Sequence, residues 1–416
     1  MLARKLYYLK RVMKNQWAKK GDLEKLRNKM LRGLLMHAER NVPFYHDLWK
    51  KNDVDISKIK TVGDISKLPV ITRKDVLENY KSMMAANYQR THDVSKLTLR
   101  ATSGTSGNPL EMIFDERAND YLEAVYLRGL MVAGYKPWKP LVYYWWKDFE
   151  KRAYNDFGFM NKVYVPCSLS EDEQLKILQS KNTGYVYYYG GILYSIAQKM
   201  LRFGIRIDAE TVITHAEMIT NQMRKRIADA FGVEPFDQYG TTEFNRLAWQ
   251  CEKREDYHVD ADSVIMELGG EGTDVITGLA NYMLPMIRYD MGDVIETSDG
   301  CSCGRTLPTI KAVKGRKEDM IIMKSGKVFT PADIADAIAP IPDLFKFSVI
   351  YLGNSKFRAD VVPFKGAKNI EDAVERALKS RLDEDAKIDV SVVDEIPKSK
   401  RGKRTFVSVD KDINTV

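Results

Sequence analysis

The sequence predicts an α/β protein with a large multi-layered N-terminal domain at residues 1–314 and a small α+β C-terminal domain at residues 315–416. Its 416 residues exceed the usual length of one domain, so two domains are expected. From about residue 97 onward, short runs of β-branched and aromatic residues alternate with longer amphipathic stretches. Strands that alternate with helices in this way are typical of an α/β layered domain.

A helical segment at about residues 1–95 precedes the strands. Apolar side chains recur three and four positions apart, as at Leu31, Leu34, Leu35 and Ala38, until Pro43 breaks the pattern. Later spacing predicts strands at 97–99, 141–145, 185–189 and 212–214, and helices at 192–203 and 222–231. Gly232 is placed to end the second of these helices in the left-handed conformation.

The glycines at 269–272 predict a hairpin between strands 264–268 and 273–277. Beyond about residue 315 the pattern predicts helices at 331–338 and 370–380 and strands at 346–351, 357–362 and 387–393. These elements make a unit of roughly a hundred residues, an ordinary size for a domain.

The composition is that of a globular protein, with 44% apolar and 29% charged residues. The formal charge of +8 is scattered, and a small polyanionic ligand explains it as well as nucleic acid, so no nucleic-acid partner is expected. The basic, amphipathic residues 1–20 lack the apolar core of a signal peptide, and no run of about 18 apolar residues occurs. We therefore expect a cytoplasmic protein without a transmembrane segment. Its first helix either packs on the body or lies on a membrane surface.

A loop at residues 102–109 has the composition of a phosphate-binding loop. Its hydroxyls and glycines belong to Thr102, Ser103, Gly104, Thr105, Ser106 and Gly107. Glycines let the backbone approach a ligand closely, and hydroxyls with exposed amides can surround phosphate oxygens. The loop lacks the Gly-Lys-Ser/Thr of a Walker sequence. An exposed Ser/Gly turn is the alternative interpretation.

Five stretches in a fixed order resemble the adenylate-forming superfamily of acyl-CoA synthetases, adenylation domains and luciferases. They are residues 101–109, 239–243, 288–293, 315–319 and 397–403. Residues 41–45, 68–73 and 301–305 look like the phenylacetate–CoA ligase branch. That branch also includes capsular-polysaccharide (CapK-like) proteins and enzymes that adenylylate a deazaflavin coenzyme. The resemblance covers essentially the whole chain.

This resemblance implies the adenylate-forming fold, with a mobile C-terminal lid hinged near residues 315–319, and an AMP-forming acid–thiol ligase. Such an enzyme activates an aryl or small organic acid with ATP and Mg²⁺ as acyl-AMP and passes the acyl group to coenzyme A. Two alternatives are a non-CoA acceptor in polysaccharide or coenzyme modification, and a non-catalytic nucleotide-binding homologue. The presence of Glu243, Asp293, Arg316 and Lys403 argues against the second. Relatives are often dimeric, so a homodimer is one expectation.

The resemblance also assigns roles to single residues. Glu243 is expected to bind Mg²⁺, a hard cation suited to one carboxylate plus phosphates. Tyr239 would lie against the adenine and Asp293 would accept hydrogen bonds from the ribose, although an aspartate beside a glycine often only caps a turn. Lys403 would bridge the substrate carboxylate and the α-phosphate, unless it belongs to a solvated basic tail. The remaining assignments are Thr242 as catalytic, and Glu217, Asp237, Gly240, Thr241 and Arg316 as nucleotide-binding.

Two further features carry open alternatives. Cys251, His258, Cys301 and Cys303 offer three thiolates and one imidazole, which fit a closed tetrahedral Zn²⁺ site. Some relatives carry a structural metal near these positions. Buried free cysteines and a structural histidine are the alternative. The aromatic runs at 143–146 and 187–189 either line the pocket for the acid or fill strand core, and His215 is either structural or a ligand contact.

Overall fold

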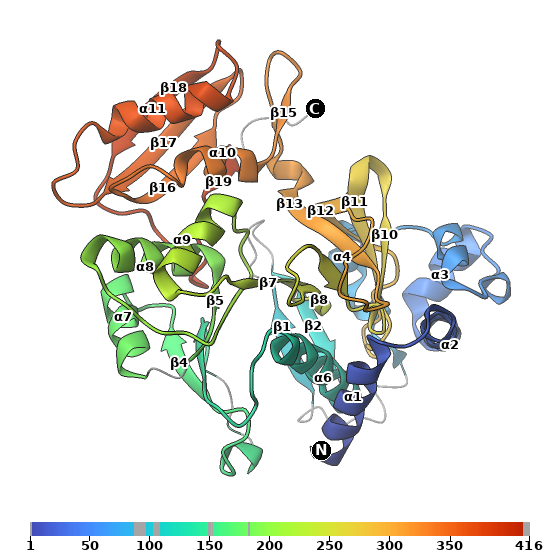
Figure 1. The fold of residues 1–416 in the computed structure, drawn as a ribbon. Helices are drawn as coiled ribbons and strands as arrows, with labels where there is room; N and C mark the ends of the chain where they lie inside the picture. The colour runs from blue at the N-terminus through green and yellow to red at the C-terminus, as the bar shows by residue number, and fades with distance from the viewer. Residues whose placement is uncertain are drawn as a thin grey trace. The chain divides into compact units, whose positions relative to one another are not determined.

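The computed structural model describes residues 2–86, 97–102, 109–148, 151, 153–181 and 184–410, and it confirms the α/β class (Figure 1). The chain forms two compact units, each built from two chain segments. The first contains residues 1–132 and 238–312, and the second contains residues 133–237 and 313–416. The second segment of the second unit begins at residue 313, close to the predicted domain boundary at residue 315. The division into sequential domains of 1–314 and 315–416 stays a prediction.

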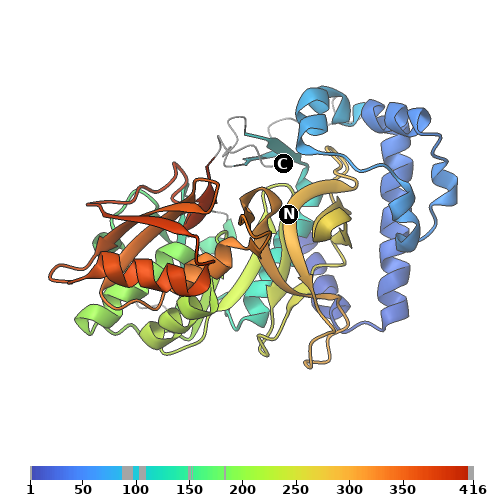
Figure 2. The same cartoon turned by 90° about the horizontal axis from the view of Figure 1, so that it is seen from above.

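The first unit contains the predicted N-terminal helices and one further helix, α6, that was not predicted. They are α1 (Leu2–Asn15), α2 (Lys20–Asn41), α3 (Pro43–Lys51), α4 (Arg73–Met83) and α6 (Glu116–Val132), with short 3-10 turns at Ile56–Lys58 and Val62–Lys67. Pro43 separates two helices, as expected, because it occupies the first position of α3, where its missing N–H costs nothing. Figure 2 shows the N-terminal helices, in blue, beside the strands drawn in yellow and orange. Among the described helices, none is long and apolar enough to cross a membrane.

The strands of the first unit pair antiparallel. They are β1 (Thr98–Ala101), β2 (Glu111–Phe114), β8 (Asn245–Gln250), β9 (Tyr257–Val259), β10 (Val264–Leu268), β11 (Thr273–Gly278), β12 (Tyr289–Thr297) and β13 (Thr309–Arg316). The predicted hairpin is confirmed as β10 and β11, with Val264 opposite Gly278. In β7 (Phe236–Thr241) the chain passes from the second unit into the first, where the strand pairs with β8.

A buried charge network joins α6 to the turn between β9 and β10. Arg128 lies 2.5 Å from Asp260 and 2.7 Å from Asp262, and all three side chains are fully buried. Arg246 donates to Asp260 at 2.8 Å, and the indole N–H of Trp249 donates to the same carboxylate at 2.8 Å. Buried charges are tolerated only when they are paired and hydrogen-bonded in this way.

The second unit contains a parallel four-stranded layer in the order β6-β5-β3-β4. Its elements are β3 (Leu141–Trp145), β4 (Lys162–Pro166), α7 (Glu171–Ser180), β5 (Tyr185–Tyr189), α8 (Gly190–Phe203), β6 (Thr211–His215) and α9 (Asn221–Phe231). Gly232 ends α9 at φ +72°, and its N–H donates to Ala228, as the sequence predicts.

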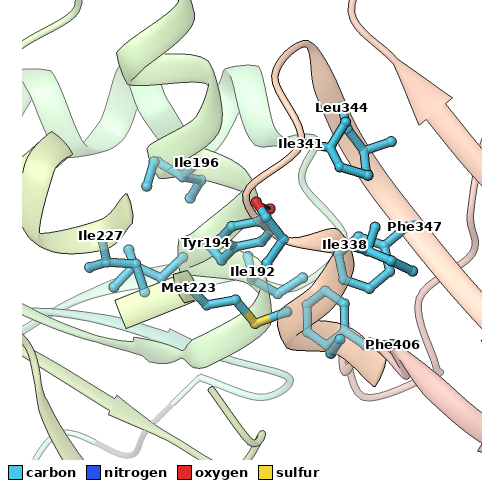
Figure 3. Close-up of a cluster of buried hydrophobic side chains, with 14 of the residues drawn as sticks. Ile192, Tyr194, Ile196, Met223, Ile227, Ile338, Ile341, Leu344, Phe347 and Phe406 are labelled. Atoms are coloured by element: carbon cyan, nitrogen blue, oxygen red, sulfur yellow. Dashed lines mark hydrogen bonds between the residues drawn. The ribbon is translucent and has the colours of Figure 1, made fainter. Parts of the chain in front are cut away.

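The remaining elements of this unit form the predicted α+β arrangement. They are β14 (Ile321–Ile322), β15 (Val328–Phe329), α10 (Pro331–Ile338), β16 (Leu344–Tyr351), β17 (Lys356–Pro363), α11 (Ile370–Arg381), β18 (Lys387–Val392) and β19 (Val407–Val409). Figure 3 shows side chains of α8 and α9, such as Ile192 and Met223, packed against Ile338, Phe347 and Phe406. The two chain segments of this unit therefore share one hydrophobic core.

Candidate functional site

The predicted phosphate loop connects the two strands of the β1–β2 hairpin. Thr102 and Leu110 close its base, because the Thr102 N–H donates to the Leu110 carbonyl and the Leu110 N–H donates to Thr102 Oγ1, both at 2.8 Å. Arg73 donates to the same hydroxyl at 3.4 Å. The predicted residues Ser103, Gly104, Thr105, Ser106 and Gly107 lie outside the described residues. The hairpin thus fixes the two points between which the loop runs.

Tyr239 and Asp293, predicted for the nucleotide, lie together in the first unit. The Tyr239 hydroxyl is 2.5 Å from Asp293 Oδ2 and 2.8 Å from Asp274 Oδ2. A hydroxyl has one hydrogen, so Tyr239 can donate a full hydrogen bond to only one of these two carboxylates at a time. Burial, followed by the charge of Asp293, raises the pKa of Asp274 to about 7, so this carboxyl holds its proton more readily than an ordinary aspartate. The sequence did not predict Asp274. Asp293 is oriented by hydrogen bonds with both Tyr239 and Asp274.

The turn after β7 places the other motif residues of this unit. Any side chain at Gly240 would put its Cβ 2.5 Å from the Asn245 carbonyl oxygen, so only glycine allows the two strands to approach this closely. Thr241 Oγ1 accepts a hydrogen bond from the Phe244 N–H at 3.3 Å, which fixes the turn through Thr242. Glu243 follows in the same turn, and its buried carboxylate lines a pocket that also contains Asn281. Its predicted binding of Mg²⁺ stays a prediction.

Lys403 lies in the second unit on a tightly held loop. The Lys403 carbonyl accepts from the Ser399 N–H at 2.8 Å, and the Lys403 N–H donates to Ser399 Oγ at 3.0 Å. The Tyr144 hydroxyl donates to the Gly402 carbonyl at 3.1 Å. Gly402 has φ +75°, and a Cβ there would lie 2.4 Å from Cys167 Cβ, so glycine is required beside Lys403 for two reasons.

Carboxylates hold the chain directly after Lys403. Glu217 Oε1 accepts from the Arg404 N–H at 2.5 Å, and its Oε2 accepts from the Gly191 N–H at 2.7 Å. The Arg404 guanidinium pairs with Glu171, which also accepts from Lys346 at 3.0 Å. Burial opposes the charge of Glu171, but Arg404 and Lys346 outweigh it and lower its pKa to about 2. Three of these partners, Glu171, Lys346 and Arg404, were not predicted, since they are far apart in the sequence.

Burial raises the pKa of Glu217 to about 7, against the opposing effect of the two N–H groups. The folded protein therefore holds this proton more tightly than the unfolded chain. Protonated Glu217 therefore stabilises the fold fully at pH values below 4.5, the ordinary pKa of glutamate. This stabilisation is lost as the pH rises to about 7. The loss should amount to about 3 kcal/mol in the free energy of unfolding.

The measurement compares urea unfolding of the native protein and Glu217→Gln between pH 4.5 and 8. Burial lowers the pKa of His215, which gives the opposite slope, but this contribution is common to both proteins and cancels in their difference. The native protein should lose stability relative to the variant as the pH rises. A constant difference across this range would contradict the assignment.

Two other predicted residues have separate surroundings. Asp237 accepts a hydrogen bond from Thr214 Oγ1 at 2.6 Å and is nearly buried. Arg316, predicted at the domain junction, is half exposed and lies 3.5 Å from Glu318. The structure provides a local partner for each, and their nucleotide-binding roles stay predictions.

The four predicted metal ligands come together in the first unit. Their ligand atoms all lie within 4.8 Å of one another, with Cys251 Sγ 3.5 Å from Cys301 Sγ and Cys303 Sγ 3.3 Å from His258 Nε2. The Lys253 N–H donates to the Cys251 sulfur at 3.4 Å, but burial has the larger effect and raises the pKa of that thiol.

The surroundings of this cluster suit a metal ion. Burial, followed by the charge of Arg305, lowers the pKa of His258 to about 4, so the imidazole is neutral, the form that binds metals. Glu255 accepts from the N–H of Ser302 at 3.0 Å and thereby holds the loop between Cys301 and Cys303. The donor set, three sulfurs and one nitrogen, fits Zn²⁺.

The predicted aromatic runs divide according to strand alternation. Tyr144 and Tyr188 belong to the hydrophobic core, with centroids 5.0 Å apart. Tyr143 and Tyr187 stack with their centroids 5.2 Å apart, and the His215 ring stacks on Tyr187 at 3.8 Å. The strand-core interpretation is confirmed for Tyr144 and Tyr188, and pocket lining by Tyr143 and Tyr187 stays a prediction.

Comparisons with known proteins agree with this architecture. No protein-family model matches the chain. The phenylacetate-coenzyme A ligase of Pseudomonas putida is 26% identical over 343 residues, which cover 77% of this chain and 76% of that protein. Protein CapK of Staphylococcus aureus is 23% identical over 417 residues, covering 93% and 89%. The crystal structure of 2-hydroxyisobutyryl-CoA ligase with an acyl-AMP has a TM-score of 0.76 at 16% identity, over 96% of this chain and 92% of that one, which shows a shared fold.

Proposed function

We propose, since the chain belongs to the phenylacetate–CoA ligase-like branch of the adenylate-forming enzyme superfamily, that it joins a carboxylic acid to coenzyme A using ATP. A carboxylate oxygen attacks the α-phosphate, and the bond to pyrophosphate breaks. The thiol sulfur of coenzyme A then attacks the acyl carbonyl, its proton passes to solvent, and AMP leaves. The relatives named as CoA ligases support this sequence of steps.

The observation that carries the proposal is the loop at residues 397–404. Tyr144, Glu217 and Glu171 hold the residues on both sides of Lys403, so its backbone position is fixed before any ligand binds. Attack of one anion on a polyanion needs a positive charge at a fixed place, and preorganised charge is worth most in such a step. Lys403 supplies it, and Glu243 would hold the Mg²⁺ that neutralises the phosphates.

A second candidate function keeps the adenylation but uses another acceptor. It is favoured by one observation, that CapK matches 93% of this chain whereas the phenylacetate–CoA ligase of Pseudomonas putida matches 77%. Acid-dependent exchange of pyrophosphate into ATP tests adenylation, and detection of a thioester after addition of coenzyme A separates the two candidates. The cytoplasmic location, the homodimer and the lack of a nucleic-acid partner stay predictions.

The cysteine and histidine cluster is proposed to hold a structural Zn²⁺ that joins the loop at 301–303 to residues 251–258. Protein purified without chelator should contain about one zinc per chain. The Cys301→Ser variant should lose the metal and melt at a lower temperature. Cys167 lies outside the cluster, so Cys167→Ser should keep the metal and the native melting temperature. Elemental analysis and thermal unfolding measure these effects. Metal-free native protein would refute the site.

A further inference from the structure

The first helix, α1, has two faces of different character. Its inner face packs on α6, where Arg4 pairs with Asp120 at 2.5 Å and the Tyr8 ring meets the edge of Tyr121 with centroids 5.3 Å apart. Val12, on the same inner face, is fully buried. Ion pairs and apolar contacts therefore hold α1 on the first unit by this face, and the outer face is turned toward solvent.

The outer face of α1 begins with apolar side chains. Leu2, Leu6 and Tyr7 expose 45%, 48% and 57% of their surface, and Trp17, just beyond the end of the helix, exposes 51%. Single exposed apolar side chains are ordinary, whereas a contiguous group is typical of an interaction surface. Residues four apart lie on the same side of a helix, so Leu2 and Leu6 form one apolar surface, with Tyr7 next to it.

The rest of the outer face and the turn that follows it are basic. The exposed cations are Lys10, Arg11, Lys14, Lys19 and Lys20. Within the described part of the chain, none of these five belongs to an ion pair. The first acidic residue of the sequence is Asp22, so the segment has no negative charge of its own. Uncompensated positive charge beside apolar side chains fits a partner that is negative at its surface and apolar beneath.

A bilayer with anionic phospholipids has both of these properties. Basic side chains reach the phosphates of such a bilayer, while leucine and aromatic side chains enter the boundary between head groups and acyl chains. Nucleic acid would pair with the cations but would leave Leu2 and Leu6 in solvent. A second copy of this chain would cover the leucines but would bring like charges together.

We propose that the outer face of α1 docks the protein on an anionic membrane surface. Leu2, Leu6 and Tyr7 enter the bilayer boundary, and Lys10 and Lys14 contact the lipid phosphates. The helix lies along the surface, in keeping with the finding that none of the described helices is long and apolar enough to cross a membrane. The inference is independent of the proposed function, because it uses no residue of the candidate site.

The test is co-sedimentation of the full chain with lipid vesicles. Vesicles of phosphatidylcholine alone are compared with vesicles of equal parts phosphatidylcholine and phosphatidylglycerol. We expect binding to the anionic vesicles only, and its loss at about 1 M salt, where the Debye length is about 3 Å. Lys10→Gln combined with Lys14→Gln should lower the partition coefficient by about 5-fold for each lysine. Leu2→Gln combined with Leu6→Gln should lower it by about 10-fold.

Lys50→Gln combined with Lys51→Gln is the matched control. These two lysines are exposed at the end of α3, and the 22-residue helix α2, about 33 Å long, separates α3 from α1 in the chain. The control removes the same charge as the α1 lysine variant and should bind like the native protein. All three variants replace exposed side chains and should keep the native melting temperature. If the leucine variant melts lower, the lysine variant decides.

Three results would overturn the inference. They are binding to neither kind of vesicle, equal binding to both kinds, and undiminished binding of the α1 lysine variant. Sedimentation equilibrium without lipid adds a further check. A dimer that the leucine variant dissociates would assign the outer face of α1 to a second copy of the chain and would also overturn the inference.

Discussion

Replacing Lys403 with alanine is expected to lower the rate of acid-dependent ATP–pyrophosphate exchange by about two to three powers of ten. The loop around Lys403 is fixed by Tyr144 and Glu217, so the backbone that carries the ammonium group is in place before the substrates bind. Removing it leaves the negative charge that develops between carboxylate and α-phosphate without its preorganised partner. Binding of the substrates should change little, and the loss of activity should appear mainly as a lower kcat.

Lys400→Ala is the matched control for this variant. Lys400 belongs to the same basic run and is exposed, so its replacement removes an equal charge from the neighbourhood. If Lys403 merely belonged to a solvated basic tail, the two variants would behave alike. We expect near-native exchange in Lys400→Ala, and exchange in Lys403→Ala at the same level would remove the catalytic assignment.

Replacing Arg128 with methionine is expected to lower the free energy of unfolding by about 3 to 5 kcal/mol. The substitution removes the guanidinium that pairs with both fully buried carboxylates, so Asp260 keeps Arg246 but Asp262 loses its close counter-charge, and it removes the hydrogen bond from Arg128 to the Val12 carbonyl. Urea unfolding measures the effect. Adding Asp262→Asn should recover part of the loss, because it removes one of the uncompensated charges.

An exposed ion pair in the same unit provides the comparison. Lys25 and Asp22 are 4.0 Å apart with most of both side chains in solvent, so Lys25→Met should change stability by less than about 1 kcal/mol. A loss in Arg128→Met no larger than that of Lys25→Met would mean that the network contributes little. It would contradict the view that this network is needed to hold α6 against the turn after β9.

Local signals in the sequence were sufficient for most helices but for only about half of the strands. The helix at 331–338 has the predicted bounds, because Thr330 and Pro331 mark its start and apolar residues recur with helical spacing. Gly232 ends its helix as predicted, for the same kind of local reason. The gathering of Cys251, His258, Cys301 and Cys303 was also predictable, since cysteine and histidine are few and their chemistry is specific.

Other features depend on tertiary contacts and left no local signal. Asp274 belongs to the candidate site only because folding places its carboxyl group within hydrogen-bond distance of the Tyr239 hydroxyl. The pairing of Glu171 with Arg404 joins residues more than two hundred positions apart, and no short pattern announces it. The motifs at 239–243 and 397–403 predict catalytic residues, but they do not reveal the carboxylates that hold those residues in place.

The most direct test of the central claim is ATP–pyrophosphate exchange by the native protein with saturating ATP and Mg²⁺, over a panel of aromatic, aliphatic and sugar acids. We predict exchange that depends on the acid and a thioester product when coenzyme A is added. Exchange without a thioester would favour the alternative acceptor. No acid-dependent exchange with any member of the panel would contradict the claim that this chain forms acyl-AMP.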